Sequence, residues 1–234
     1  MAKDVIIACD FSSREDTLKF LDRLGNRRPY LKIGMELYYA EGPTLVRELK
    51  ARGHRLFLDL KLHDIPNTVQ KAMAVLAALE VDMVNVHAAG TRAMMEAAIR
   101  GATHPDGTRA QVIAVTQLTS TSQERMQEEL LISASLQDTV LAYARNAQAA
   151  GLGGVVCSAL EAKAVHEACG GDFLTITPGI RFADGDVGDQ VRVATPALAR
   201  ELGADYIVVG RPITQAPEPR AAYERCLNEF CKGA

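Results

Sequence analysis

The sequence of 234 residues lacks an apolar run of about 18 residues, the length that a membrane-spanning helix requires. Its first apolar segment, residues 5–8, is too short for a secretory signal peptide and is followed by no cleavage pattern. These absences predict a cytoplasmic protein without a membrane partner.

Cysteine motifs and an excess of basic charge are missing as well. The five cysteines are an odd number and none forms a C-x-x-C pair, so neither a disulfide framework nor a zinc knuckle is predicted. Free thiols are typical of a reducing cytoplasm. Lysine and arginine total 26 against 29 acidic residues, a net charge of −3, which argues against a nucleic-acid partner.

Two common glycine-rich nucleotide motifs are also absent. The turn after the first apolar run has no G-x-G-x-x-G, and G-x-x-x-x-G-K occurs nowhere in the chain. Dinucleotide-binding and P-loop functions therefore have little support.

The strongest positive pattern is an alternation of short apolar runs with longer segments of helical periodicity. Continuously apolar runs are typical of parallel strands buried on both faces. The expected strands are residues 5–9, 30–33, 55–58, 83–86, 112–115, 154–157, 173–176 and 205–209. Eight strand–helix units without a linker predict an α/β fold, a (β/α)₈ TIM barrel, as a single domain over residues 1–234. A doubly wound open sheet is the alternative.

Local signals mark several expected helices. Ser13 with Asp16 resembles a shortened capping box, and Pro66 suits a first helical turn. In the longer gap between the fifth and sixth expected strands, Thr121 with Glu124 predicts a capping box that opens an extra helix. Helices are expected to stop at Gly25, Gly53, Gly151 and Gly203.

Charged residues stand at the carboxyl ends of the first three expected strands, where barrel enzymes place their catalytic groups. Asp10 follows the first strand and Lys32 lies on the second. Asp59 and Lys61 follow the third, and two residues apart on an extended chain they face the same side. Buried charges are costly unless they pair, and once paired they form a preorganised electrostatic site. The pattern favours catalysis over an ion network that only holds the barrel mouth together.

The ends of the seventh and eighth expected strands carry features of a phosphate site, which barrels often build from these loops. Gly179 and Gly210 allow a close approach of the backbone, and Arg211 offers a planar, permanently charged group. The segment 181–190 between them is rich in glycine and aspartate, which favours a closing loop with Gln190 reaching inward.

Taken together, these residues resemble the orotidine 5′-phosphate decarboxylase family. The strongest match is the segment Asp59-x-Lys61-x-x-Asp64-Ile65-Pro66-Asn67-Thr68, of which related sugar-phosphate enzymes share the D-x-K-x-x-D part. Further matches, in the family's order, are Asp10, Lys32 with Gly34-Met35-Glu36, Leu118-Thr119-Ser120, Pro178-Gly179-Ile180-Arg181, Asp189-Gln190 and Gly210-Arg211. The resemblance runs from Val5 to about Tyr223.

The resemblance implies conversion of orotidine 5′-monophosphate to UMP and CO₂, the last step of de novo UMP synthesis, without a metal or an organic cofactor. Lys61 would stabilise the negative charge left at C6 of the pyrimidine and then protonate it. Asp59 would lie near the departing carboxylate, either destabilising the substrate or positioning Lys61. Lys32 and Asp64 would complete the catalytic array. The resemblance also implies a stand-alone homodimer in which Asp64 and Thr68 reach the neighbouring subunit's site.

The resemblance further implies contacts with each part of the nucleotide. Asp10 and Lys32 would hold the ribose hydroxyls, and Thr119 would hydrogen-bond the pyrimidine ring. Gln190 would bridge the base and the phosphate. The implied substrate-binding positions are Asp10, Lys32, Thr68, Thr119, Pro178, Arg181, Gln190, Gly210 and Arg211.

Two other functions remain as alternatives. A Mg²⁺-dependent keto-sugar-phosphate decarboxylase or synthase of the same superfamily would need carboxylates for its metal, and such relatives place a glutamate where this chain has Lys32. A non-catalytic barrel that binds phosphorylated ligands would use the charged array only for structure. His63 and His87 lie near the same mouth, but their spacing is not that of metal ligands, so no metal site is predicted.

Overall fold

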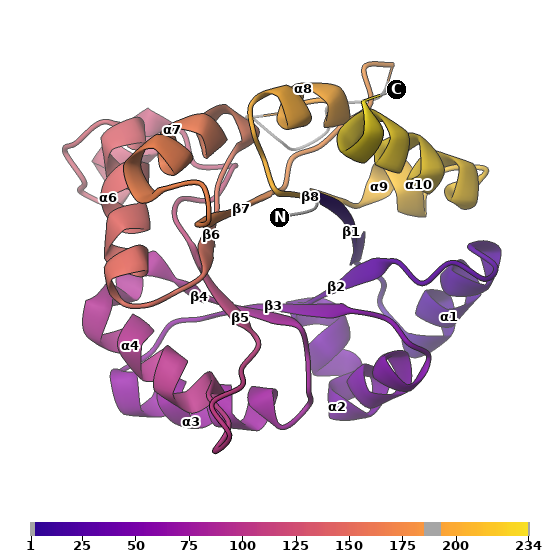
Figure 1. Cartoon of the computed structure of the whole chain (residues 1–234), viewed down its shortest axis with the longest axis horizontal. Coiled ribbons are helices and arrows are strands. Elements are labelled where there is room, and N and C mark those ends of the chain that lie inside the picture. Colours follow the sequence, from indigo (N-terminus) through magenta and orange to yellow (C-terminus); the bar gives the residue numbers. More distant parts are fainter. Residues whose placement is uncertain (1–2, 185–192, 234) are drawn as a thin grey trace.

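Eight parallel strands within the described residues, 3–184 and 193–233, close into a barrel in this computed structural model (Figure 1). The strand order follows the chain, and β1 pairs with both β2 and β8. The strands are β1 Asp4–Cys9, β2 Tyr30–Gly34, β3 Leu56–Leu62, β4 Met83–His87, β5 Gln111–Val115, β6 Gly154–Val156, β7 Leu174–Thr177 and β8 Tyr206–Val209. Pairing of the first strand with the last confirms the (β/α)₈ TIM barrel over the open doubly wound sheet.

Helices cover the outside of the barrel (Figure 1). They are α1 Arg14–Arg23, α2 Met35–Ala51, α3 Pro66–Ala77, α4 Thr91–Ala102, α5 Gln123–Glu129, α6 Leu136–Ala149, α7 Ala159–Cys169, α8 Pro196–Glu201, α9 Arg211–Thr214 and α10 Pro219–Leu227. A 3₁₀ turn (η1, Ala88–Gly90) and a π-helical turn (η2, Asn228–Lys232) complete them. Within the described residues, none of the helices has both the length and the apolar character that crossing a membrane requires.

The expected start and stop signals account for several helix ends. The Ser13 side chain accepts a hydrogen bond from the Asp16 N–H at the start of α1, and Pro66 occupies the first turn of α3. Gly53 and Gly151 follow helix ends with a φ of 85°, a left-handed conformation that glycine adopts without strain.

The prediction of a capping box at Thr121 is wrong by one residue. The Thr121 N–H donates to the Leu118 carbonyl at 2.9 Å, which closes a turn before the helix begins. The next hydroxyl in the chain, on Ser122, therefore caps α5 and accepts from the Arg125 N–H at 3.3 Å.

The barrel interior forms an apolar cluster of its own, separate from the layer between strands and helices. Its members are Ile6, Ala8, Tyr30, Phe57, Met83, Ile113, Leu174, Ile176, Tyr206 and Val208. Because side chains alternate along a strand, the inward position that follows Phe57 is Asp59. On the next strand, the inward position after Met83 is Asn85. The inward face thus becomes polar toward the carboxyl end of the barrel, and this change builds the site.

The five cysteines, all of which lie within the described residues, are free thiols, as expected. Burial raises the pKa of Cys9 to about 12, although Lys32 opposes the shift. The thiol next to the site therefore stays protonated at neutral pH and is a poor nucleophile.

Close packing of α4 on α3 gives a test of the fold. A methyl group on Gly101 would collide with the Gln70 carbonyl oxygen. We expect Gly101→Ala to lower the free energy of unfolding by about 1–3 kcal/mol, because overpacking outweighs the helical preference of alanine, about 1 kcal/mol. Urea unfolding measures the change. Gly171→Ala is the control, since its methyl group meets open space, and equal stability of both variants would contradict the packing.

Candidate active site

Four charged residues meet at the carboxyl ends of β1, β2 and β3, and we call them the Lys–Asp network: Asp10, Lys32, Asp59 and Lys61. Lys32 Nζ lies 3.0 Å from Asp10 Oδ1 and 3.3 Å from Asp59 Oδ2. Lys61 Nζ lies 2.6 Å from Asp59 Oδ1. The structure therefore brings together all four residues that the strand ends suggested, with alternating charges.

Burial and pairing act in opposite directions on this network. The side chains of Lys32 and Asp59 are only 11% and 13% exposed. Burial raises the pKa of Asp59, but the neighbouring ammonium groups of Lys32 and Lys61 outweigh it and hold that pKa below its usual value. Burial likewise lowers the pKa of Lys32, and the carboxylates of Asp59 and Asp10 raise it further than burial lowers it. Both groups are thus held in their charged forms.

The backbone around Lys61 departs from a regular strand. Lys61 has a φ of +49°, a left-handed conformation that costs a non-glycine residue about 1–3 kcal/mol. The pairing of β3 with β4 also shifts, from Leu58 opposite Val84 to Leu62 opposite Val86. Asp59 and Lys61 nevertheless point to the same side, as their spacing predicted, because their side chains meet.

A cavity of about 240 Å³ opens beside the network. Lys32, Asp59 and Lys61 of the network line it, and so do Thr119 and Pro178. The full lining is Lys32, Phe57, Asp59, Lys61, Val115, Gln117, Leu118, Thr119, Ser120, Val156, Ile176, Pro178 and Val208. Apolar side chains together with a few polar and charged groups are the usual lining of a small-molecule site.

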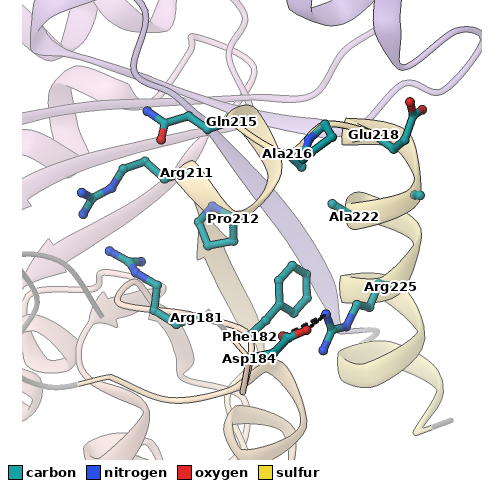
Figure 2. Close-up of a pocket in the computed structure, with 12 residues that line it drawn as sticks. Arg181, Phe182, Asp184, Arg211, Pro212, Gln215, Ala216, Glu218, Ala222 and Arg225 are labelled. Carbon is teal, nitrogen blue, oxygen red and sulfur yellow. Dashed lines mark hydrogen bonds and ion pairs between the residues drawn. The ribbon is translucent and has the colours of Figure 1, made fainter. Parts of the chain in front are cut away.

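A second cavity, of about 660 Å³, adjoins the end of β8 (Figure 2). Arg181 and Arg211 line it, and Figure 2 shows both side chains extending to the same side, away from α10. A methyl group on Gly210 would lie 3.8 Å from Asp10 Oδ2, so the residue before Arg211 is close to the Lys–Asp network. Gln190 lies outside the described residues.

Asp64 and Thr68 are exposed and stand apart from the network. Asp64 follows β3, and its Oδ1 accepts a hydrogen bond from the Ile65 N–H at 2.7 Å. In residues 3–184 and 193–233, its side chain makes no hydrogen bond or ion pair with the network. Within one chain, the structure therefore does not bring Asp64 to Lys61.

The rings of His63 and His87 lie in a tilted contact near the same mouth, with centroids 5.7 Å apart and an interplanar angle of 40°. Burial lowers the pKa of His87, and the electrostatic effect of neighbouring His63 and Lys61 lowers it further, against the opposing effect of Asp59. In the described part of the chain, no group of three or more His, Cys, Asp or Glu side chains is placed to hold a metal ion.

One residue of the site, Asn85, escaped sequence reasoning. It is 1% exposed and hydrogen-bonds both Asp59 and Lys61. Gln117 lines the cavity, and a methyl group on Gly34 would lie 3.3 Å from Lys32 Nζ. The alternation along β4 was the available signal for Asn85, a polar residue that follows Met83 on the inward face.

Comparison with known proteins places these features in a family. The chain matches the orotidine 5′-phosphate decarboxylase / HUMPS family over residues 3–226. It is 58% identical to the orotidine 5′-phosphate decarboxylase of Geobacillus thermodenitrificans, with 97% of each chain covered. The Bacillus cereus protein of the same name is 53% identical, with 98% of each chain covered.

Solved structures agree with this result. The crystal structure of orotidine 5′-phosphate decarboxylase from Lactobacillus acidophilus has a TM-score of 0.87 and 40% identity, over 97% of this chain and 99% of that one. An uncharacterized conserved protein from Geobacillus kaustophilus has a TM-score of 0.85 and 49% identity over the same shares.

The ionisation of Asp59 gives a test of the network. We expect its carboxyl group to titrate below the ordinary aspartate pKa of about 3.9, because the two ammonium groups outweigh burial. The stabilisation that ionised Asp59 provides is then complete above about pH 4 and is lost as the pH falls toward the folded-state pKa. A carboxyl-carbon NMR titration measures the midpoint, with the signal assigned by its loss in Asp59→Asn. A midpoint above the ordinary value would contradict the pairing.

Proposed function

Because this chain belongs to the orotidine 5′-phosphate decarboxylase / HUMPS family and is a carboxy-lyase, we propose that its Lys–Asp network converts orotidine 5′-monophosphate to UMP and CO₂. This reaction is the last step of de novo UMP synthesis. The observation that carries the proposal is the Lys32–Asp59–Lys61 chain of alternating charges on the wall of the 240 Å³ cavity.

The chemical difficulty lies at C6 of the pyrimidine. When the C6–CO₂⁻ bond breaks, its electron pair stays on C6, and no adjacent carbonyl is arranged to accept it. A fixed cation beside C6 stabilises that charge as it develops. Lys61 supplies the cation and then transfers a proton from its ammonium group to C6, which completes UMP. Water returns the proton to Lys61 after release of the products.

Asp59 acts by holding Lys61. Its Oδ1 lies 2.6 Å from Lys61 Nζ, and its Oδ2 faces Lys32, so the carboxylate fixes the ammonium group on the cavity wall. A prepositioned charge needs no reorganisation during the reaction, which is the main source of electrostatic catalysis. Lys32 and the partner subunit's copy of Asp64 complete the array.

The rest of the nucleotide is held at a distance from the reacting carbon. Asp10 and Lys32 bind the ribose hydroxyls, and Thr119 bonds the pyrimidine ring. The phosphate lies at Arg211 and Arg181, with the Gly210 backbone beside it, and binding there helps to organise the reacting end. The other substrate contacts assigned here are Thr68, Pro178 and Gln190.

The exposed segment after β3 supports a homodimer. Asp64 and Thr68 are exposed, and the apolar Ile65 beside them is 66% exposed. A second copy would cover Ile65 and receive Asp64 and Thr68 in its own site. We place this dimer in the cytoplasm, with residues 1–234 of each copy forming one catalytic domain.

The pairing of Lys32 favours this reaction over a Mg²⁺-dependent one. A metal-assisted enediolate reaction needs carboxylates that are available to the cation. Here Lys32 forms an ion pair with one oxygen of Asp10 and with one oxygen of Asp59. Lys61 forms an ion pair with the other oxygen of Asp59. The nearby carboxylates thus already have cationic partners.

The activity is tested by the ultraviolet absorbance of orotidine 5′-monophosphate mixed with the purified protein, with and without EDTA. We expect conversion to UMP that is indifferent to the chelator. Lys61→Ala should lower kcat by about four orders of magnitude or more while the circular dichroism spectrum is unchanged. A folded wild-type protein without activity, or a modest loss in Lys61→Ala, would overturn the proposal.

Sharing of the site is tested by mixing two inactive variants, Lys61→Ala and Asp64→Ala. A hybrid dimer has one site with both residues intact, so an equal mixture should regain about a quarter of wild-type activity after random exchange of subunits. Exchange is followed independently with tagged subunits. If hybrids form and activity does not return, Asp64 does not serve the neighbouring site.

A further inference from the structure

We propose that Asn85 is a positioning residue for the decarboxylation, whose one buried amide fixes the Asp59 carboxylate and the Lys61 main chain relative to each other. This inference rests on the proposed function and deepens it, because it identifies the residue that fixes the position of the Lys61 ammonium group. Asn85 lies on β4, faces the barrel interior, and is 1% exposed.

The need for such a residue arises from the irregular pairing of β3 with β4. From Leu58 to Leu62 the chain advances four residues, whereas its partners Val84 and Val86 are two residues apart. The surplus backbone between Leu58 and Leu62 contains Asp59 and Lys61. A bulge of this kind re-aims side chains and leaves backbone groups without ladder partners.

The Asn85 side chain supplies the missing partner. Its Oδ1 accepts a hydrogen bond from the Lys61 N–H at 2.8 Å, and its Nδ2 donates to Asp59 Oδ1 at 2.7 Å. The same Asp59 oxygen lies 2.6 Å from Lys61 Nζ. Asn85, Asp59 and Lys61 therefore form a closed ring of contacts through both the main chain and the side chain of Lys61.

The orientation of the amide follows from chemistry alone. A backbone N–H can only donate, so the carbonyl oxygen of Asn85 must face Lys61. An ionised carboxylate can only accept, so the NH₂ group must face Asp59. An apolar side chain of similar size meets neither demand, and a hydroxyl would have to reach both groups from a single oxygen atom. An amide presents its acceptor and its donor on separate atoms, and it joins the two groups without adding a charge.

The contacts of Asn85 affect catalysis by fixing where the Lys61 ammonium group lies relative to the reacting carbon. The left-handed backbone at Lys61 is unfavourable and persists only where its surroundings hold it. The Asn85 oxygen holds that backbone, while its amide keeps Asp59 turned toward the ammonium group. Loss of the amide should let both groups relax, and a displacement of about 1 Å at a reacting group costs about 100-fold in rate.

The test compares Asn85→Leu with Thr175→Val. Thr175 is also fully buried, and its hydroxyl donates a hydrogen bond to the Asp205 carboxylate. Asp205 precedes β8, so this contact lies at the end of the barrel opposite the site. Both variants should lose stability. We expect Asn85→Leu to lower kcat about 100-fold with little change in KM for orotidine 5′-monophosphate, because the phosphate contacts stay in place. Thr175→Val should keep wild-type kcat. An Asn85→Leu variant with wild-type kcat would overturn the proposal.

A second measurement does not depend on activity. The Asp59 carboxyl group faces Lys32 from β2, Lys61 from β3 and His87 from β4, with Asp10 of β1 beyond Lys32. Removal of the Asn85 donor should raise the Asp59 titration midpoint in a carboxyl-carbon NMR titration, whereas Thr175→Val should leave it unchanged. An unchanged midpoint in Asn85→Leu would refute the positioning role, whatever reaction the wild-type protein catalyses.

The near-isosteric variant Asn85→Asp separates positioning from packing. It keeps the shape of the side chain and the acceptor for the Lys61 N–H, but its carboxyl group can donate to Asp59 only when protonated. The ratio of its kcat to that of wild type should therefore rise as the pH falls from about 8 to about 5. A ratio that does not change with pH would show that the amide donor has no role.

Discussion

The Asp59 carboxylate stands between two ammonium groups, and the rest of the site depends on this arrangement. It lies 2.6 Å from Lys61 Nζ and 3.3 Å from Lys32 Nζ, while its side chain is only 13% exposed. A single charge buried to this extent would be strongly unfavourable, whereas alternating charges compensate one another. The arrangement also holds a cation on the cavity wall before any substrate arrives. Such a cation stabilises negative charge without reorganising, which is what loss of CO₂ from a pyrimidine ring demands.

The barrel provides this arrangement through the alternation of side chains along its strands. Inward positions are apolar in the middle of the barrel and become charged or polar at the carboxyl end, as the step from Phe57 to Asp59 shows. The closure of β8 on β1 then brings Gly210, and Arg211 after it, close to Asp10. One end of the barrel therefore holds both the Lys–Asp network and the arginines that we propose for the phosphate, while the strands below remain a packed core.

Much of this could be predicted from the sequence, because period-two alternation and strand-end placement are local properties. All eight expected strands exist, and Asp10, Lys32, Asp59 and Lys61 meet as expected. The bulge at Lys61 was not predicted, because it depends on how β3 pairs with β4 rather than on either segment alone. The alternation along β4 marks Asn85 as an inward polar residue, but its hydrogen bonds to Asp59 and Lys61 depend on that bulge and were missed for the same reason. The exposed position of Asp64 shows that one chain alone does not complete the proposed array.

The most direct test of the central claim, that Lys61 stabilises negative charge at C6 and delivers the proton, is exchange of the C6 hydrogen of UMP in D₂O. Exchange forms the same carbanion from the product side and involves no CO₂. We predict that proton NMR will show loss of the C6–H signal with the wild-type protein and none above the buffer rate with Lys61→Ala. Equal exchange by the two proteins would contradict the role of Lys61, and decarboxylation by a wild-type protein that never exchanges this hydrogen would contradict a carbanion at C6.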